Sequence, residues 1–517
     1  MYYAPIVIER RRKELEMPEI NIILGPPGTG KTEELLRIVD RELKEKTADS
    51  NEIGFFSFTT KATNEARDRA KEKFSLTDDD LPYFCTLHAF GKRQLGMAKT
   101  EIMNPKDYKS FSAESGVDLE FVTQDWEDTG IITTDNKLLR EINKCRNQCM
   151  ELEEFYNKHN FNFNWYELLM AYRALEDYKH GNNKHDFTDM LSLWIETGPT
   201  PKLEVVFIDE AQDLTNLQWK MCSKIWKNAK RVYISGDDDQ AIFRWAGASI
   251  EHFINMEGNV TILKHSYRCP RAVHRIADSI VKRIDNRRDK EWLPRNVHGV
   301  AELHAYPDPI DLSIGKWLVL APCGYMLNEI EENLRQQGLA YKKNNKLPVK
   351  KEILSAIDAW KKLNEGDELS YDEVSYIYSY LPTKIGVERG YKNLNTLSED
   401  KMYGVEELTM HHGLCASGTP WDVVFEKIGN RNIEYIRSLE KVNKTLSSDP
   451  LINLSTIHMA KGGECDNVML FTDLSRANRE EMEVNPDDTH RVFYVGVTRA
   501  KEQLHIIEPQ NYGGFKI

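Results

Sequence analysis

A glycine-rich octapeptide constrains the fold of this chain more than any other feature of its sequence. Its residues are Gly25, Pro26, Pro27, Gly28, Thr29, Gly30, Lys31 and Thr32. An apolar run (20–25) leads into it and an amphipathic stretch (32–46) follows it, so the chain passes from a buried strand through a tight turn into a helix. Such a turn points backbone N–H groups at phosphates, with a lysine for the β- and γ-phosphates and a threonine hydroxyl for Mg²⁺. The octapeptide, which we call the phosphate loop, therefore predicts a site for a nucleoside triphosphate and Mg²⁺.

Short apolar runs that end in polar or glycine residues recur along the chain. They lie at 20–25, 52–58, 204–210, 231–237, 259–265, 316–322, 467–473 and 504–509. Continuous apolar runs of this length are typical of parallel strands that are buried on both faces. Helical patterns separate most of them, as at 63–74 and 270–284. The alternation predicts an α/β architecture.

Two adjacent carboxylates follow one of these runs. In VVFIDEAQD (205–213) the strand delivers Asp209 and Glu210 to its carboxyl end, where α/β proteins bind their ligands. Asp209 suits Mg²⁺ coordination, and Glu210 suits polarisation of an attacking water. A helix-capping acidic pair is the alternative interpretation, and the phosphate loop upstream argues against it.

The strand candidates are unevenly spaced along the chain. Two stretches, about 95–185 and 350–450, contain few of them and carry amphipathic helical patterns instead, as at 164–178 and 350–366. The phosphate loop and the carboxylate pair are also much further apart in sequence than neighbouring βαβ units require. We therefore expect a mostly helical insertion in each of two α/β cores.

Composition limits the classes of partner and the location. Asp and Glu (82) outnumber Lys and Arg (69), which argues against a nonspecific coat on nucleic acid but allows a local basic groove. No apolar run reaches the ~18 residues of a membrane span, and the first residues turn charged too early for a signal peptide. Eight scattered cysteines favour reduced thiols. A cytoplasmic protein of bacterial or viral type, without membrane contact, is expected.

The segment SGDDDQAIFRWAGAS (235–249), together with the carboxylate pair, resembles motifs of the UvrD/Rep/PcrA-like superfamily 1 DNA helicases. Further segments resemble that family's motifs in the same order along the chain. They are FSFTTKATNEARDR (56–69), TLHAF (86–90), HDFTDML (185–191), LKHSYRCP (263–270), GLAYKK (338–343), INLSTIHMAKGGECDNVML (452–470) and THRVFYVGVTRAKEQLHI (489–506). The resemblance spans residues 20–506, nearly the whole chain.

The resemblance implies an α/β fold of two RecA-like P-loop domains, in which helices flank parallel sheets and each core carries a mostly helical insertion. In this family ATP lies in the cleft between the cores. The expected boundaries are 1–95 and 185–262 for the first core, 96–184 for its insertion, 263–354 and 450–517 for the second core, and 355–449 for its insertion.

Five further nucleotide-site residues follow from the resemblance. Gln240 aligns with a glutamine that senses the γ-phosphate and couples it to DNA. Arg268 and Arg499 align with two arginines that reach the γ-phosphate from the second core, where added positive charge stabilises the transition state. Tyr267 aligns with the residue that stacks on adenine, and Glu464 with the one that contacts the ribose.

The same motifs imply contacts to single-stranded DNA. Phe58 and Trp245 match aromatic positions that stack on bases, and stacking suits a motor because it tolerates any sequence. Core packing is the alternative for both aromatic residues. Further DNA-contact positions in these motifs are Lys61, His88, Arg244, Thr456 and His458.

The chain departs from the family pattern in three informative places. No glutamine occurs before Gln94, although the family reads the adenine edge with one upstream of the phosphate loop, so weak discrimination between ATP and GTP is expected. Arg244 precedes Trp245, where the family often has Trp-Arg-Gly. The second insertion is shorter than in the large repair helicases.

The function expected from the sequence is an ATP-dependent DNA helicase or translocase. It would move 3′ to 5′ on single-stranded DNA and unwind duplex at single-strand/double-strand junctions during replication, repair or recombination, as a monomer when isolated. Its protein partners are not identified by the sequence. A translocase that displaces bound proteins with little unwinding, and a nucleotide-gated DNA-binding scaffold, are the alternatives.

Overall fold

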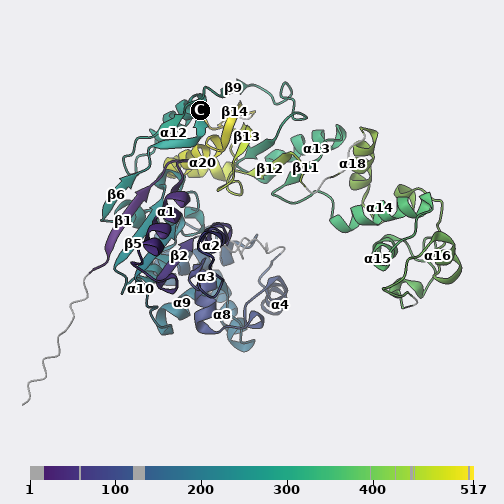
Figure 1. Ribbon diagram of the computed structural model, residues 1–517, viewed down its shortest axis with the longest axis horizontal. Coiled ribbons are helices and arrows are strands. Elements are labelled where there is room, and N and C mark those ends of the chain that lie inside the picture. Colours follow the sequence, from purple (N-terminus) through teal and green to yellow (C-terminus); the bar gives the residue numbers. More distant parts are fainter. Residues whose placement is uncertain are drawn as a thin grey trace, which may run out of the picture. The chain divides into compact units, whose positions relative to one another are not determined.

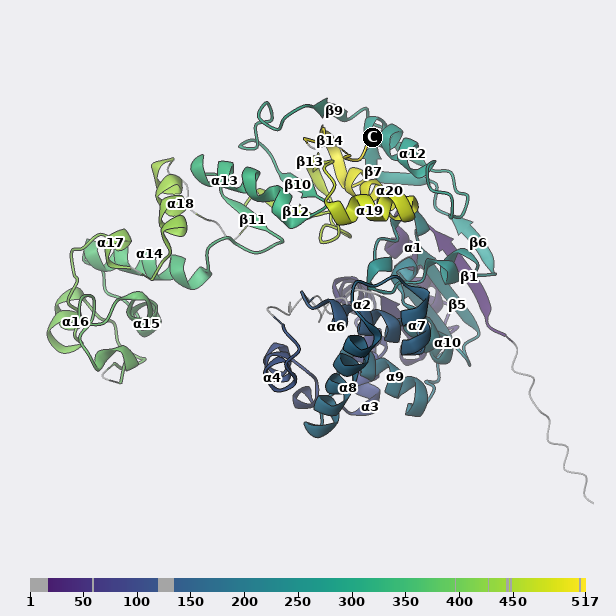
Figure 2. The same ribbon diagram turned by 180° about the vertical axis from the view of Figure 1, so that it is seen from behind.

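The computed structural model describes residues 17–57, 60–119, 134–395, 397–425, 427–442, 446, 449–510 and 513–517, with Lys61 described by its backbone alone. The chain forms two compact units (Figure 1 and Figure 2). Unit 1 comprises residues up to Gly299 together with Glu480–Thr498 and Ile517, and unit 2 comprises Val300–Arg479 and Arg499–Lys516.

Unit 1 is built on a six-stranded parallel sheet in the order β3-β2-β4-β5-β1-β6. The strands are β1 (Glu19–Leu24), β2 (Ile53–Ser57), β3 (Phe84–Thr86), β4 (Val205–Asp209), β5 (Arg231–Gly236) and β6 (Asn259–Ile262). In register, Ile22 of β1 lies beside Ile234 of β5 and Val260 of β6. The central strands β2, β4 and β5 are almost entirely buried, as expected for a parallel sheet covered on both faces.

Helices cover both faces of this sheet. Helices α1 (Lys31–Lys44) and α2 (Thr60–Phe74) form one hydrophobic core with alternate strand residues such as Ile23 and Phe207. Helices α3 (Leu87–Leu95), α9 (Phe187–Thr197) and α10 (Asn216–Ile225) form the opposite core, with Ile22 and Val206. Successive strand residues thus point to different helical layers, which fixes the register of the sheet.

A helical part of unit 1 lies between β3 and β4 in the sequence. It contains α4 (Pro105–Ser115), α6 (Lys137–Asn147), α7 (Leu152–Lys158) and α8 (Trp165–Gly181), which share a core of their own. A buried ion cluster ties it to α9. Arg146 of α6 and Lys179 of α8 both bond Asp186 and Asp189 at the start of α9. Such a cluster fixes the helices to the sheet layer, because each buried charge has an opposite partner.

The rest of unit 1 follows β6. It comprises the parallel pair β7 (His265–Pro270) and β8 (Leu293–Arg295), the helix α12 (Arg271–Val281), and α20 (Pro486–Val497), which packs against α12. The short helix α11 (Ile250–Ile254) precedes β6, and α19 (Arg476–Val484) precedes α20.

Unit 2 contains a second six-stranded parallel sheet, in the order β11-β12-β10-β13-β14-β9. Its strands are β9 (Val300–His304), β10 (Trp317–Ala321), β11 (Tyr341–Lys343), β12 (Ile452–Thr456), β13 (Cys465–Phe471) and β14 (Ala500–Ile507). The edge strand β9 pairs with β14 alone, Glu302 lying beside His505.

One face of this sheet shares a continuous core with the helical part of unit 2. The helices are α13 (Asn328–Gln336), α14 (Lys351–Glu365), α15 (Tyr371–Tyr380), α16 (Val405–His411), α17 (Trp421–Val424) and α18 (Asn430–Lys441). Near β11 a buried ion pair, Arg335 with Glu331, is bridged by the Tyr341 hydroxyl.

The predicted α/β fold with two parallel sheets flanked by helices is confirmed. Each of the eight apolar runs predicted as strands overlaps an observed strand; the strands are β1, β2, β4, β5, β6, β10, β13 and β14. The other six strands among the described residues were not predicted individually. Strands β3, β8 and β11 have three residues each, the polar β7 and β9 lack an apolar run, and β12 (INLST) has only two apolar residues, which are not adjacent. Every helix in the described part of the chain is too short or too polar to cross a bilayer.

Candidate nucleotide and nucleic-acid sites

The phosphate loop connects β1 to α1 in unit 1. The Gly25 N–H donates to the Gly236 carbonyl of β5 at 3.1 Å, which anchors the start of the loop in the sheet. Lys31 Nζ donates to the Gly25 carbonyl at 3.0 Å, and the Thr29 hydroxyl donates to the Pro26 carbonyl at 2.8 Å. Since α1 begins at Lys31, its unpaired N–H groups and the positive end of its dipole border the loop. This arrangement is suited to an anion.

Strand β7 runs directly against the phosphate loop, although more than two hundred residues separate them in sequence. The Tyr267 N–H donates to the Gly28 carbonyl at 2.8 Å, and the Ser266 hydroxyl donates to the Pro27 carbonyl at 2.7 Å. Gly28 has φ +70°, and a Cβ there would lie 2.3 Å from Arg268 Cβ, so only glycine fits. Unit 1 therefore places Tyr267, with its side chain 75% exposed, and Arg268 beside the loop.

The carboxylate pair lies at the end of β4, next to the start of α1. Thr32 Oγ1 donates to Asp209 Oδ2 at 2.7 Å, and the Ser235 hydroxyl of β5 donates to the other oxygen of Asp209. Burial, and then the neighbouring Glu210, raise the pKa of Asp209 above its ordinary value. Glu210 is in the left-handed region (φ 54°), which is costly for a residue with a Cβ and typical of functional turns.

A chain of hydrogen bonds connects Glu210 to Gln240. Gln212 Nε2 donates to Glu210 Oε2 at 2.5 Å, and Gln212 Oε1 accepts from the Asp237 N–H at 3.0 Å. Gln240 Nε2 in turn donates to Asp237 Oδ2 at 2.6 Å. Four side chains from two neighbouring strand ends thus form one polar network at the carboxyl edge of the sheet.

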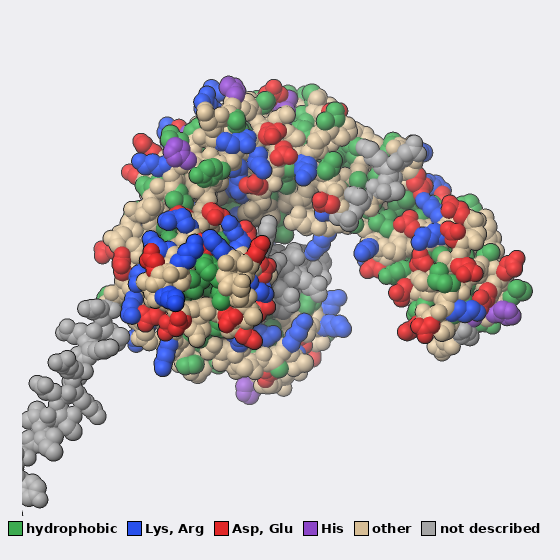
Figure 3. All heavy atoms as spheres, in the orientation of Figure 1, with side chains coloured by type: hydrophobic (Ala, Val, Ile, Leu, Met, Phe, Trp, Pro, Cys, Tyr) green, Lys and Arg blue, Asp and Glu red, His purple; other side chains and the backbone are tan. Residues whose placement is uncertain are grey.

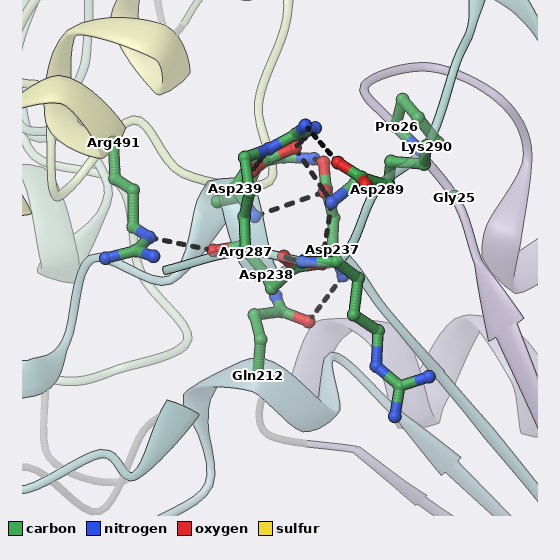
Figure 4. Close-up of polar contacts among 12 residues, drawn as sticks. Gly25, Pro26, Gln212, Asp237, Asp238, Asp239, Arg287, Asp289, Lys290 and Arg491 are labelled. Atoms are coloured by element: carbon green, nitrogen blue, oxygen red, sulfur yellow. Dashed lines mark hydrogen bonds and ion pairs between the residues drawn. The ribbon is translucent and has the colours of Figure 1, made fainter. Parts of the chain in front are cut away.

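Asp237, Asp238 and Asp239, which we call the acidic triplet, are held by cations from the segment before β8 (Figure 4). Lys290 Nζ lies 3.3, 2.6 and 2.8 Å from the three carboxylates in that order, and its side chain is fully buried. Arg287 binds both oxygens of Asp239, at 2.8 and 2.7 Å. Lys290 and Arg287 thus place two positive charges against the three buried carboxyl groups.

Further contacts fix the backbone around the acidic triplet. The Arg288 N–H donates to Asp238 Oδ2 at 2.7 Å, and Arg491 Nε of α20 donates to the Asp238 carbonyl at 3.0 Å. Burial raises the pKa of Asp239, but Lys290 and Arg287 outweigh burial and hold this pKa below its ordinary value. Burial lowers the pKa of Lys290, but the three carboxylates outweigh it and raise that pKa. The acidic triplet thus connects β5 to the segment before β8 and to α20 through ion pairs and hydrogen bonds.

The sequence did not reveal the cations, the amide and the hydroxyl group that support this site. They are Gln212, Ser235, Arg287, Lys290 and Arg491. A signal was present in the acidic triplet itself, since three consecutive carboxylates at the end of a buried strand need nearby cations. The segment DNRRDKEW (285–292) supplies them, but only the fold shows that it does.

The described DNA-contact candidates of unit 1 lie in three different environments. Trp245 is 46% exposed in the turn after the acidic triplet, so core packing does not account for it. Arg244 is paired with Asp488 of α20 at 3.2 Å and lies near Glu251 at 3.7 Å. His88 packs against Phe187, and burial lowers its pKa to about 4. Phe58 and the side chain of Lys61 lie outside the described residues.

The remaining site candidates lie in unit 2. The buried Arg499 lies just before β14, and its Nη1 donates to the Gly463 carbonyl at 3.0 Å. Glu464 is paired with Lys501 at 3.4 Å. Thr456 ends β12 and accepts a hydrogen bond from the Met459 N–H, in the turn that also contains the half-buried His458. Thr456 therefore lies at the carboxyl edge of this parallel sheet, whereas Glu464 and Arg499 lie at its amino edge, just before β13 and β14.

Comparison with known families and proteins agrees with this architecture. The UvrD/REP helicase N-terminal domain matches residues 9–261, and the UvrD-like helicase C-terminal domain matches residues 451–507. Together the two matches cover more than half of the chain. The phosphate loop and the acidic triplet lie in the first matched region, and Arg499 lies in the second.

Individual relatives are distant in sequence. A probable DNA helicase II homolog of Mycoplasma genitalium is 22% identical over 94% of this chain and 82% of its own length. The ATP-dependent DNA helicases Rep of Buchnera aphidicola and PcrA of Bacillus subtilis are 25% and 24% identical over 50% and 54% of this chain. Those two matches span only 40% of each relative's length.

The fold and the site define a P-loop protein with two parallel α/β sheets. With the two matched domains, the chain belongs to the UvrD/Rep family of helicases.

Proposed function

We propose that this chain is an ATP-dependent DNA motor that moves 3′ to 5′ along single-stranded DNA and opens duplex at junctions. The observation that carries the proposal is the continuous polar network from the phosphate loop through Asp209 and Glu210 to Gln240. It joins the atoms suited to phosphate chemistry to the turn that exposes Trp245, a candidate base-stacking side chain. The polarity rests on membership of the family.

The residues around Thr32 fit a Mg²⁺ ion that accompanies the nucleotide. Thr32 Oγ1 and Asp209 supply oxygen atoms, the ligands that Mg²⁺ prefers, and Ser235 fixes one carboxylate oxygen. When bound, the ion would neutralise developing charge on the phosphates. Lys31 would bind the β- and γ-phosphates in place of its present bond to the Gly25 carbonyl. Glu210 would accept the proton of the attacking water, held in position by Gln212.

Arginines and the adenine platform complete the proposed site. Arg268, fixed beside Gly28 by β7, would stabilise charge on the γ-phosphate, and Tyr267 offers an exposed ring for the base. Arg499 and Glu464 would act from unit 2 as a second arginine and a ribose contact, in keeping with the family.

Gln240 is the proposed link between hydrolysis and DNA. Asp237 contacts both Gln240 and Lys290. A change at the γ-phosphate that moves Gln240 would therefore alter the ion pairs of the acidic triplet. The turn with Arg244 and Trp245 follows the acidic triplet in the sequence. Arg244 is paired with Asp488 of α20, the helix whose Arg491 bonds the Asp238 carbonyl. The acidic triplet therefore joins the nucleotide sensor to the candidate DNA contacts within one unit.

A specific observation favours the translocase alternative, in which the protein displaces bound proteins with little unwinding. The outer part of the second helical stretch, 365–425, has eleven acidic and four basic residues. Figure 3 shows acidic side chains gathered on the visible face of this region. A surface of this sign repels duplex phosphates, so we do not assign it a duplex grip.

Translocation and unwinding can be separated with fluorescent substrates. For a 3′ to 5′ motor, a single strand labelled at the 5′ end gives a lag and an arrival signal with ATP, whereas a 3′ label gives prompt loss. Strand displacement from a 3′-tailed duplex, beside displacement of streptavidin from biotinylated single strands, distinguishes helicase from translocase. Binding without an ATP-dependent arrival signal at either end would support the scaffold and contradict the proposal. We also propose that the isolated protein is monomeric and cytoplasmic; sedimentation tests the first point.

A further inference from the structure

Two histidines and a glutamate converge at the edge of the sheet in unit 2. Glu302 and His304 are two apart on the edge strand β9 and so face the same side, and His505 of β14 lies directly beside Glu302. His304 Nε2 lies 2.9 Å from His505 Nδ1. Glu302 Oε2 lies 3.5 Å from the first of these nitrogens and 3.7 Å from the second. Three donor atoms thus surround one point.

We propose that Glu302, His304 and His505 form a binding site for a divalent transition-metal ion such as Zn²⁺. A tetrahedral ion with nitrogen and oxygen ligands at about 2.0–2.1 Å holds its donor atoms roughly 3.3 Å apart. The three separations lie on both sides of that value, so small side-chain rotations suffice. The site is independent of the nucleotide chemistry, which uses other residues.

Neighbouring groups orient the central ligand. His505 Nε2 lies 3.2 Å from Gln503 Oε1 on the same strand, and an amide oxygen only accepts, so Nε2 carries the proton. His505 Nδ1 is then left with its lone pair directed at the cluster. The ring packs against Trp317, with centroids 5.4 Å apart. A second partner that fixes the tautomer and the ring orientation is the usual support of a histidine ligand.

Burial and charge suit an ion that enters from one side. The side chains of His304 and His505 are mostly buried, whereas that of Glu302 is 56% exposed and leaves room for water or for entry of the ion. Burial, and then His304, lower the pKa of His505 below its ordinary value, which favours the neutral imidazole. The carboxylate supplies one negative charge to a dication.

The donor set selects the class of ion. Two imidazoles and one carboxylate suit Zn²⁺, Co²⁺ and Ni²⁺, whereas Mg²⁺ and Ca²⁺ prefer oxygen ligands alone. The site should therefore ignore the Mg²⁺ that accompanies ATP. A bound ion would join β9 to β14, its only partner in the sheet, and stabilise the folded state by mass action.

The test uses the full-length protein without a histidine tag, titrated with Co²⁺ in the presence of millimolar Mg²⁺ and followed by visible absorption. We expect one Co²⁺ per chain, displaced by Zn²⁺, and a higher Tm with Zn²⁺. His304→Asn should weaken binding by at least about tenfold and remove the Tm increase. Glu302→Gln should weaken it less. His411→Asn, which removes an exposed histidine of α16 in the same unit, is the matched control and should change nothing.

Three results would overturn the proposal. The first is Co²⁺ binding that His304→Asn leaves unchanged. The second is a sulfur-to-metal charge-transfer band, which would assign the ion to thiols, since all eight cysteines are free. The third is displacement of Co²⁺ by Mg²⁺. Circular dichroism of the metal-free variants shows whether a lost site reflects lost ligands or lost folding. Glu302→Gln serves as the second variant because that side chain is largely exposed.

Discussion

The two parallel sheets of this protein have the same number of strands but different chemistry at their strand ends. In unit 1, β1, β4 and β5 end in the phosphate loop, in Asp209 and Glu210, and in the acidic triplet. In unit 2, β10 ends at Ala321 before Pro322, and β13 ends before Thr472 and Asp473. The sheet of unit 1 collects several buried carboxyl groups and Lys290 at its carboxyl edge, whereas the two strand ends named for unit 2 carry a single buried carboxyl group, Asp473.

The difference shows that the sheet fixes positions and the residues after each strand fix the chemistry. Both sheets bring the carboxyl ends of non-adjacent segments together, because their strands are parallel and the crossovers return along helices. Only unit 1 has a glycine-rich turn between a strand and a helix whose N-terminus borders it. Phosphate chemistry is therefore expected in unit 1.

The largest expected effect is on a strand-end carboxylate of unit 1. Glu210→Gln should lower kcat for ATP hydrolysis by at least about 10²-fold, because the amide does not accept the proton of the attacking water. Nucleotide affinity should be retained. The matched control is Asp473→Asn, a buried carboxylate just after β13 in unit 2. Equal losses from the two changes, measured by phosphate release, would remove the distinction between the sheets.

A buried cation in each unit sharpens the comparison. Lys290→Met leaves the acidic triplet with one cation fewer and should cost about 3–5 kcal/mol of unfolding free energy. It should also lower kcat at temperatures where the protein is folded, because Asp237 holds Gln240.

Arg335→Met breaks the buried ion pair of unit 2 and should lower stability while leaving the ATPase unchanged.

Lys290→Arg should retain part of the turnover that Lys290→Met loses if charge is what positions Gln240. Arg287→Gln should cause a smaller loss of stability and turnover than Lys290→Met. Urea unfolding and steady-state kinetics on the same samples separate stability from positioning. A kcat of Lys290→Met that equals wild type would contradict a role in positioning.

Exposed aromatic residues of the two units should differ at intermediate magnitude. Tyr267→Ala removes a ring beside Gly28 and should raise the KM for ATP up to about tenfold, the value of one stacking contact, with little loss of stability. Tyr325→Ala, which removes another largely exposed tyrosine ring, in unit 2, should leave KM unchanged. A KM shift shared by both variants would point to a general effect on folding.

Base selectivity is expected to be small. Because stacking on Tyr267 does not distinguish purines, kcat/KM for ATP and GTP should agree within a few-fold, about 1 kcal/mol or less. Competition kinetics with the two nucleotides measures the ratio. A strong preference for ATP would indicate a hydrogen-bonding group for the adenine edge that the sequence did not reveal.

A further effect is expected on the pH dependence of stability. Burial lowers the pKa of His88 to about 4. Below its unfolded value near 6.5 the unfolded chain binds a proton that the folded chain does not, so stability falls as the pH drops from about 6.5 to 4. His88→Gln should flatten the stability curve in this range. An unchanged slope in urea titrations at several pH values would show that His88 is not buried as described.

The sequence predicted five of the six strands of the first sheet and placed GPPGTGKT and Asp209-Glu210 at strand ends, because an apolar strand followed by either segment is a local pattern with a fixed structural consequence. It did not predict Lys290 or Arg287, which reach the acidic triplet only because β7, α12 and the segment before β8 fold back onto β5. It also missed β7, whose polar residues carry no strand pattern although its backbone contacts the phosphate loop. Long-range polar partners of this kind depend on topology and not on local sequence.

The most direct test of the account is steady-state ATP hydrolysis with and without single-stranded DNA, in wild type and in Glu210→Gln. We expect DNA to raise kcat by at least about tenfold in wild type, since the network from Glu210 to Gln240 leads to the turn that presents Trp245. Glu210→Gln should still bind DNA but show no stimulated turnover. Wild-type protein that binds single-stranded DNA without any change in ATP turnover would contradict the account.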